Sequence, residues 1–208
     1  MKGLIFYLVL FLSGFSQNAA DITRQTEQKL RSLASFQAEF KQVYYSSSVS
    51  TPLTEYGTVF YKQPGLMKWA YTEPEEKIVL LMENKIQYYF PEDNQLLIQD
   101  TTGEEQGNNI MSLLSGKTHI LQDYDAESSE ENAAGNKSYH IKLIPKYDNI
   151  ENFILLDIDK KTLFIIKATF FDWAGNKQEF TFSRIQINRD LPEKTFNINV
   201  PEDVEIIK

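Results

Sequence analysis

Residues 57–74 (GTVFYKQPGLMKWAYTEP) constrain the fold more than any other stretch of the chain. Side chains alternate there with the period of two expected of β-strands, first over residues 58–62 and again over residues 66–71. Pro64 and Gly65 suit a turn between the two runs, because proline presets φ and glycine accepts a positive φ. We therefore predict a β-hairpin with a large apolar face that another element must cover. That face carries Met67, Trp69 and Tyr71.

The N-terminus has the pattern of an export signal. Lys2 precedes an apolar run over residues 4–12 (LIFYLVLFL) that is too short to span a bilayer comfortably. Small residues fit a cleavage after residue 16, and cleavage as late as residue 20 is the alternative. We predict a cleaved signal peptide over residues 1–16 and a single exported domain over residues 17–208. A buried N-terminal helix or a retained membrane anchor is the competing interpretation.

Composition excludes several classes of function. The chain has no cysteine, which excludes thiol nucleophiles, zinc–thiolate sites and a lipid-attachment cysteine. It has 21 basic and 29 acidic residues, and loss of Lys2 with the signal would leave a net charge of −9. This charge argues against binding to nucleic acid and against electrostatic adsorption to anionic membranes.

Further strand patterns dominate the rest of the chain. An amphipathic helix pattern over residues 19–34, with capping possibilities at Asp21 and Thr23, changes to a strand pattern near Ser35. Pro201 limits the last segment to an edge or irregular strand. After the hairpin, strand patterns at residues 77–82, 85–90 and 96–98 are joined by links too short for parallel crossovers. Further strand patterns cover residues 36–40, 139–144, 153–158, 163–171 and 179–187. We predict about ten strands in one strongly curved antiparallel sheet, with helices on its concave face.

One short segment is a candidate cover for the aromatic face. Asn109 could cap a helix over residues 110–115 (IMSLLS) that ends at Gly116. Apolar side chains cover most of its circumference, so the helix must be buried or must act as a removable lid. The side chains predicted to form this lid are Ile110, Met111, Leu113 and Leu114.

No catalytic or metal-binding constellation is visible in the sequence. His119 and His140 are the only histidines, and their spacing does not match that of metal ligands. Asp157 and Asp159 are interpreted as solvated positions at a strand end. We predict no enzymatic activity, no metal and no cofactor. An exported hydrolase that brings two distant carboxylates together is the alternative that the sequence leaves open.

The strands carry more large apolar side chains than a plain meander needs. They are interpreted either as the core of a sandwich or as the lining of a hydrophobic hollow shaped for acyl chains. The predicted lining consists of Phe60, Met67, Trp69, Tyr71, Leu80, Met82, Tyr88 and Phe90. A register error of one residue would invert these assignments.

Three segments of the chain resemble the LolA family of periplasmic lipoprotein carriers. They are FQAEFKQ at residues 36–42, the block G-x-V-x-Y-K-x-P-G-x-M-K-W-x-Y-x-x-P at residues 57–74, and KTFNINVPEDVEII at residues 194–207. The resemblance implies a monomeric periplasmic protein with an unclosed antiparallel β-barrel of ten or eleven strands, lidded by α-helices over a cavity for lipoprotein acyl chains. It also implies an inner-membrane ABC transporter that loads the carrier and an outer-membrane receptor that unloads it.

The chain departs from the family pattern at the hairpin turn. The family typically has an arginine that holds the lid closed where this chain has Gln63. Glutamine donates through its amide but lacks the charge and the fork of donors of arginine, so Lys62 is considered a partial substitute. A half-barrel that binds free lipid or glycolipid, or that senses envelope lipoproteins, is the alternative function.

Overall fold

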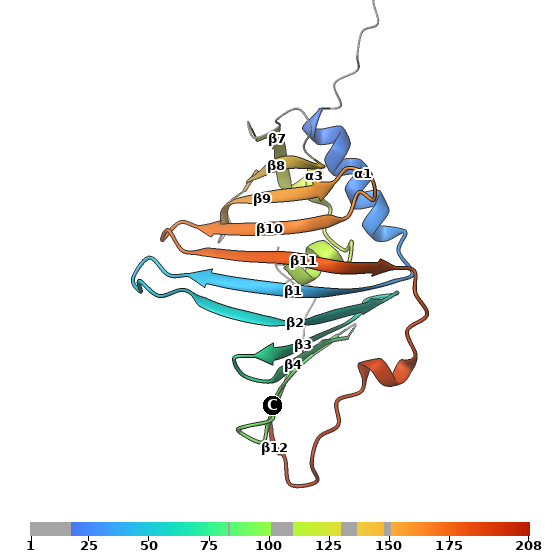
Figure 1. Cartoon of the computed structure of the whole chain (residues 1–208), viewed down its shortest axis with the longest axis vertical. Helices are drawn as coiled ribbons and strands as arrows, with labels where there is room; N and C mark the ends of the chain where they lie inside the picture. The colour runs from blue at the N-terminus through green and yellow to red at the C-terminus, as the bar shows by residue number, and fades with distance from the viewer. Residues whose placement is uncertain (1–17, 83, 101–109, 130–136, 148–150) are drawn as a thin grey trace, which may run out of the picture.

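The structure is a computed structural model that describes residues 18–82, 84–100, 110–129, 137–147 and 151–208. Its twelve strands are β1 (Ser35–Tyr45), β2 (Leu53–Lys62), β3 (Leu66–Glu73), β4 (Lys77–Leu81), β5 (Lys85–Phe90), β6 (Gln95–Asp100), β7 (Tyr124–Ser128), β8 (Ser138–Pro145), β9 (Glu151–Asp159), β10 (Ile165–Asp172), β11 (Lys177–Ile187) and β12 (Glu205–Ile207). They form one sheet in the order β12-β6-β5-β4-β3-β2-β1-β11-β10-β9-β8-β7 (Figure 1). The sheet is not closed, because β12 and β7 lie at opposite edges. The predicted unclosed barrel is therefore confirmed, with slightly more strands than expected.

Strand β1 lies near the centre of the sheet, between β2 and β11, so strands are added on both of its sides. The chain meanders outward from β1 through β2 to β6, then passes through the helices to the far edge at β7. It returns from β7 to β11, which pairs antiparallel with the free side of β1. Successive strands therefore pair with short links on both sides, as the alternating pattern predicted.

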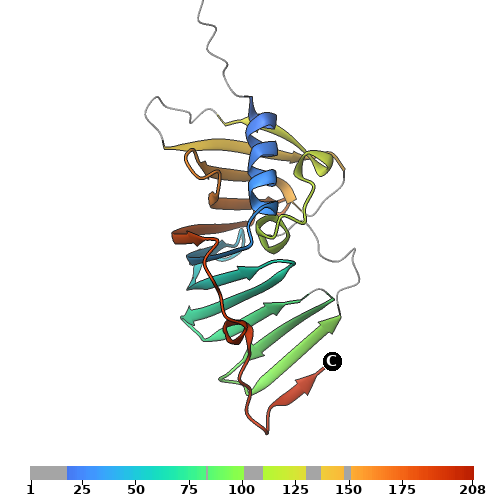
Figure 2. The same ribbon diagram turned by 90° about the vertical axis from the view of Figure 1, so that its right-hand side faces the viewer.

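Two edge strands differ from the sequence-based expectation. β7 was not predicted, because only Tyr124 and Ala126 are apolar in its short sequence. β12 pairs with β6 in parallel, whereas all pairs were expected to be antiparallel. The reason is that residues 188–204 run along the molecule and bring β12 to the sheet in the same direction as β6 (Figure 2).

Helix α1 (Ala19–Arg31) packs against the sheet near β7 and β8. Its N-cap is Asn18, whose Oδ1 accepts a hydrogen bond from the Asp21 backbone amide at 2.8 Å. The expected caps at Asp21 and Thr23 are corrected accordingly, since Thr23 lies inside the helix and donates to the Ala19 carbonyl. The buried stripe includes Ile22 and Leu30, and Figure 2 shows the helix crossing the upper strands.

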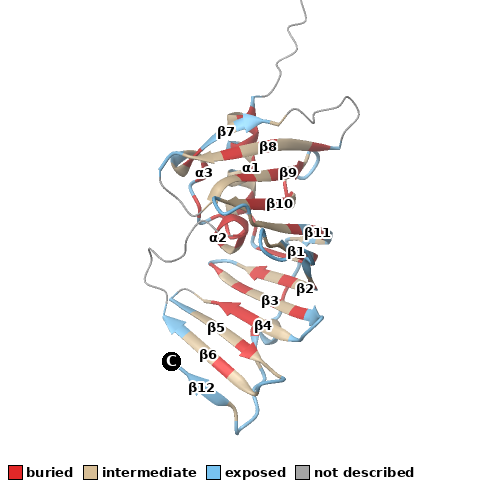
Figure 3. Cartoon of the chain, turned by 90° about the vertical axis from the view of Figure 1, so that its left-hand side faces the viewer, coloured by how far each residue is buried: buried red, intermediate tan, exposed pale blue. Residues whose placement is uncertain are grey.

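Each of the two faces of the sheet carries its own apolar cluster. The larger cluster lies on the face that carries Trp69 and packs against the helices, here called the inner face. The smaller cluster lies on the opposite, outer face, where Leu80 packs against Leu191 and Phe196. Phe196 belongs to the 3-10 helix η1 (Glu193–Phe196) of the C-terminal segment. Figure 3 shows that buried residues alternate along the strands, as the period of two requires.

Candidate functional site

The hairpin of β2 and β3 forms the floor of the site. Its register places Val59 opposite Trp69 and Tyr61 opposite Met67, all on the inner face. Met67 and Trp69 are 0% exposed. Gly57 makes this packing possible, because a Cβ atom there would lie only 2.8 Å from the Phe40 ring. Phe40 contacts Trp69 edge to face, with the ring centroids 4.8 Å apart.

Helix α2 (Ile110–Leu114) lies over this floor, close to the predicted bounds. Leu114 is fully buried, Ile110 and Leu113 are nearly so, and Met111 is partly buried against the same core. The helix ends at Gly116, whose φ of +69° is the left-handed conformation that glycine adopts readily. The proposed cap Asn109 lies outside the described residues.

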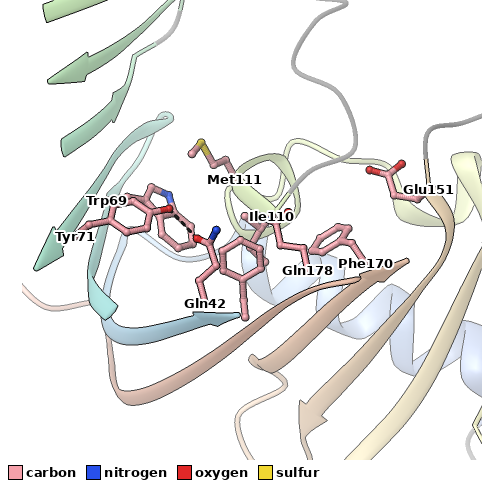
Figure 4. A pocket seen from close by; sticks show the side chains of 9 residues that line it. Gln42, Trp69, Tyr71, Ile110, Met111, Glu151, Phe170 and Gln178 are labelled. Atoms are coloured by element: carbon pink, nitrogen blue, oxygen red, sulfur yellow. Dashed lines mark hydrogen bonds between the residues drawn. The ribbon is translucent and has the colours of Figure 1, made fainter. Parts of the chain in front are cut away.

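A cavity of about 200 Å³ lies between the floor and α2. Figure 4 shows that its walls come from the sheet on both sides of β1 and from α2 itself. The lining residues are Gln42, Trp69, Tyr71, Ile110, Met111, Glu151, Phe170, Gln178 and Phe180. Two residues of the predicted floor and two of the predicted lid therefore share one cavity.

The other predicted lining residues do not reach this cavity. Met67 is buried in the inner core, and Tyr88 packs partly buried against it. Phe90 is half-buried two residues further along β5, on the same side as Tyr88.

Phe60, Leu80 and Met82 lie on the outer face, which corrects their placement in the cavity. Phe60 and Leu80 both pair with Lys68, which alternates with Trp69 along β3. The strand at residues 77–82 is apolar on both faces, so its sequence could not distinguish the cavity side from the other.

The latch positions Gln63 and Lys62 contact different parts of the molecule. Gln63 Nε2 donates to the Arg31 carbonyl at 3.2 Å, at the end of α1. Lys62 Nζ donates to the Leu191 carbonyl at 2.9 Å, in the outer-face cluster. Lys62 therefore holds the C-terminal segment and not the lid, because it alternates with the inward-facing Tyr61 along β2.

Arg31 contacts the connection between α2 and α3. Such contacts were expected from Gln63 or Lys62 at the hairpin turn. Its Nε donates to the Gly116 carbonyl at 3.0 Å, and its Nη2 lies 2.8 Å from His119 Nδ1. Glu27 pairs with Arg31 at 2.8 Å and accepts from the Ile120 backbone amide at 3.1 Å. We call Glu27, Arg31, Gly116 and His119 the α1 clamp. Ile120 begins α3 (Ile120–Asp123).

Sequence reasoning missed Arg31 because Gly116 lies 85 residues away along the chain. A basic residue in the last turn of a helix is common, since it interacts favourably with the helix dipole. No local pattern distinguished Arg31 from such a residue.

Polar groups gather at one side of the cavity. The Tyr71 hydroxyl donates to Gln42 Oε1 at 2.9 Å, and Lys77 Nζ lies 4.2 Å from the centre of the Tyr71 ring. Lys77 also forms an ion pair with Glu55. Burial, and next the negative charge of Glu55, raise the pKa of the Tyr71 hydroxyl, which therefore stays protonated.

The remaining titratable candidates have structural positions. His140 Nδ1 lies 2.7 Å from Asp157 Oδ1, on strands β8 and β9. Their neighbours Ile141 and Leu156 fill the inner core, so the pair lies on the outer face, away from the cavity. Asp159 accepts from the Thr162 backbone amide at 2.7 Å and so shapes a turn. No group of three potential metal ligands occurs among the described residues.

These features define an open, mostly antiparallel barrel with helices on its inner face and a cavity of mostly apolar lining between α2 and the sheet. Residues 31–199 match the family described as outer membrane lipoprotein carrier protein LolA. The chain therefore belongs to the LolA family, as the three sequence segments indicated. Carriers of this family are not enzymes.

Several relatives bear the name outer-membrane lipoprotein carrier protein. The one from Coxiella burnetii (strain CbuK_Q154) is 25% identical, over 99% of this chain and 96% of its own length. The one from Hahella chejuensis is 26% identical, over 86% and 84% of the two chains. A relative from Vibrio parahaemolyticus is 27% identical, over 96% and 92%.

Solved structures with low sequence identity share the fold. An uncharacterized conserved protein from Thermus thermophilus aligns with a TM-score of 0.61 at 15% identity, over 92% of this chain and 99% of its own. The Mycobacterium tuberculosis lipoprotein LppX aligns with a TM-score of 0.52 at 11% identity, over 82% and 95%. Within the described residues, no helix has the length and apolar character needed to cross a membrane.

Proposed function

We propose that the protein is a periplasmic carrier that binds lipoprotein acyl chains between α2 and the inner face of the sheet. The single observation that carries this proposal is the cavity shared by Trp69 and Tyr71 of the floor and Ile110 and Met111 of the lid. A cavity with mostly apolar and aromatic walls suits a ligand whose main group is hydrocarbon.

The size of the cavity implies that α2 must move when cargo binds. At about 200 Å³ the cavity is smaller than the roughly 300–1,000 Å³ typical of pockets for small ligands. Each methylene that leaves water contributes about 0.8 kcal/mol, so two or three acyl chains provide ample affinity for an opened cavity. The protein then alternates between a closed empty population and an open loaded one.

Transfer across the periplasm requires a donor and an acceptor. The proposed donor is an inner-membrane ABC transporter, and the proposed acceptor is an outer-membrane receptor. The net charge of the chain is −8 with the signal and would be −9 without it. A basic surface on either partner would complement it. The carrier acts as a monomer and catalyses no reaction.

Extraction of the purified protein with organic solvent, followed by mass spectrometry, tests the proposal. Acylated peptides are the expected bound species. Free phospholipid or glycolipid would instead support the alternative half-barrel function. An absence of any ligand, together with hydrolytic turnover, would exclude both.

A charged substitution in the lid should abolish cargo binding. Met111 lines the cavity but is only partly buried, whereas a change at the fully buried Leu114 would also disturb the core. We expect Met111→Glu to lose lipoprotein acceptance by at least about 10-fold, because loading would bury the carboxylate against acyl chains.

The matched control is Leu53→Glu, at a site that is 52% exposed. It should accept lipoprotein normally, and circular dichroism should show both variants folded. Normal acceptance by Met111→Glu would disprove the assignment of α2 as the lid.

A further inference from the structure

The indole nitrogen of Trp69 is an unpaired buried donor on a side chain that lines the cavity. Trp69 is 0% exposed and lines the cavity, yet its Nε1 has no hydrogen-bond acceptor among the described residues. Buried tryptophan N–H groups usually have a partner, since an unpaired buried donor is destabilising. A ligand that brings an acceptor into the cavity would therefore gain a hydrogen bond that the empty protein lacks.

Gln42 supplies a second donor at the same wall. Its Oε1 accepts the hydrogen bond from the Tyr71 hydroxyl, which fixes the orientation of the amide. The Nε2 group then points away from Tyr71, and Gln42 itself lines the cavity and is 8% exposed (Figure 4). Lys77 Nζ lies over the Tyr71 ring, 4.2 Å from its centre, and Glu55 pairs with Lys77, so both contacts favour the Tyr71 position that this hydrogen bond needs.

The chemistry of the cavity limits the ligand group that these donors recognise. No basic side chain is among the described residues that line it, and Glu151 lies across the cavity from Trp69 (Figure 4). A carboxylate or phosphate would therefore be desolvated without a counter-ion. A neutral group with a carbonyl oxygen that accepts hydrogen bonds, attached to hydrocarbon, satisfies both the donors and the apolar walls.

We propose that Trp69 Nε1 and Gln42 Nε2 bind the carbonyl oxygen of an ester-linked or amide-linked acyl chain. This inference rests on the proposed carrier function and deepens it. The subsite distinguishes an acylated anchor from an ether-linked chain, which lacks the carbonyl, and from a free fatty acid, which carries a charge. Hydrocarbon burial supplies the affinity, and the two donors set the depth at which the chain linkage stops.

A pair of lipopeptides isolates the contribution of the carbonyl. One carries two ester-linked palmitoyl chains, and the other carries two ether-linked hexadecyl chains on the same peptide. Binding is measured by calorimetry in the variant Trp173→Phe, which leaves Trp69 as the only tryptophan. We expect the ester lipopeptide to bind at least about 3-fold more tightly, the effect of one neutral hydrogen bond, and up to about 100-fold more tightly if both donors bind the carbonyl. It should also shift the indole ¹⁵N–H resonance of Trp69 downfield, and the ether analogue should not.

Removal of the N–H group without loss of the ring is the matched test. When Trp69→Phe is added to Trp173→Phe, the ratio of the affinities for the ester-linked and ether-linked lipopeptides should fall. The remaining ratio should reflect the single hydrogen bond from Gln42. Replacement of Trp69 by β-(3-benzothienyl)alanine keeps the ring shape and places sulfur where the N–H was, which covers the case in which Trp69→Phe folds poorly. An unchanged ester preference in these variants, or equal affinity for the two lipopeptides in the parent, would overturn the subsite. Failure of the parent to bind either lipopeptide would instead overturn the carrier function.

Discussion

Two of the three buried side-chain polar atoms that lack a hydrogen-bond partner among the described residues belong to residues that line the cavity, and the third is Thr26 Oγ1 on α1. Besides Trp69 Nε1, the Oε2 atom of Glu151 is buried without a hydrogen-bond partner among the described residues. Burial raises the pKa of Glu151 above its ordinary value of 4.5. An unpaired buried polar atom is destabilising, so both atoms lower the stability of the folded protein relative to an apolar core.

The raised pKa of Glu151 predicts a pH-dependent loss of stability. The folded protein holds this proton more tightly than the unfolded chain does, so stability falls as pH rises from the ordinary pKa to the raised one. We expect Glu151→Gln to raise Tm by about 2 to 4 °C at neutral pH, and to have little effect below the ordinary pKa.

Thermal unfolding followed by circular dichroism at several pH values measures this effect. The control is Glu92→Gln, at an exposed turn position, which should leave Tm unchanged at every pH. An equal gain for Glu151→Gln at acidic and neutral pH would contradict the proposed cause.

At the scale of secondary-structure elements, side-chain hydrogen bonds join the end of α1 to the connection after α2. The α1 clamp joins them through the Arg31 side chain, and Gln63 adds a hydrogen bond from the hairpin turn. The Tyr61 hydroxyl also donates to the Ser115 carbonyl at 3.3 Å. Arg31 therefore contacts the connection after α2 from the end of α1, whereas the hairpin-turn residue Gln63 contacts α1 itself.

Loss of the Arg31 side chain should loosen the lid. Arg31 is about one-third exposed, so we expect Arg31→Gln to weaken closure by only about 1 kcal/mol, or about 5-fold in the closing equilibrium. Amide hydrogen exchange at Ser115 and Gly116, whose amides bond within the lid, should accelerate by that factor.

The matched control for this prediction is Arg24→Gln on the same helix. Among the described residues, Arg24 pairs only with Asp21 on an exposed surface, and such pairs contribute little. Equal acceleration in both variants would indicate general loosening of α1 and not a latch.

At the scale of the whole molecule, the two faces of the sheet pack against different elements. The inner face carries the cavity and packs against α2, and the outer face packs against the C-terminal segment. Lys68 Nζ donates to the Asn197 carbonyl at 2.8 Å, and β12 then covers the edge of β6. An exposed edge strand is prone to pair with other chains, so this segment protects the sheet.

Truncation of an outer-face residue should therefore reduce stability without affecting cargo. We expect Leu80→Ala to lower the free energy of unfolding by about 2–5 kcal/mol, because Leu80 is buried under Leu191 and Phe196. Its affinity for a diacyl lipopeptide, measured under conditions where it is fully folded, should equal that of the parent. Denaturant unfolding and calorimetry provide the two numbers.

The control is Ile206→Ala, at a site that is 53% exposed, which should change neither quantity by much. A large loss of lipopeptide affinity in Leu80→Ala would contradict the outer-face placement of Leu80. It would support the sequence-based prediction that Leu80 lines the cavity.

Local patterns in the sequence were sufficient to predict most of the strands, though not β7, and also the hairpin with its Pro64-Gly65 turn, the aromatic floor at Trp69 and the apolar helix after residue 109. These features depend on alternation and on turn residues, which act over a few positions. Only the tertiary structure decided that Leu80 faces outward and that Arg31 reaches the lid. Both results depend on contacts between segments about 85 or more residues apart. A strand that is apolar on both sides, or a basic residue at a helix end, carries no local signal of its distant partner.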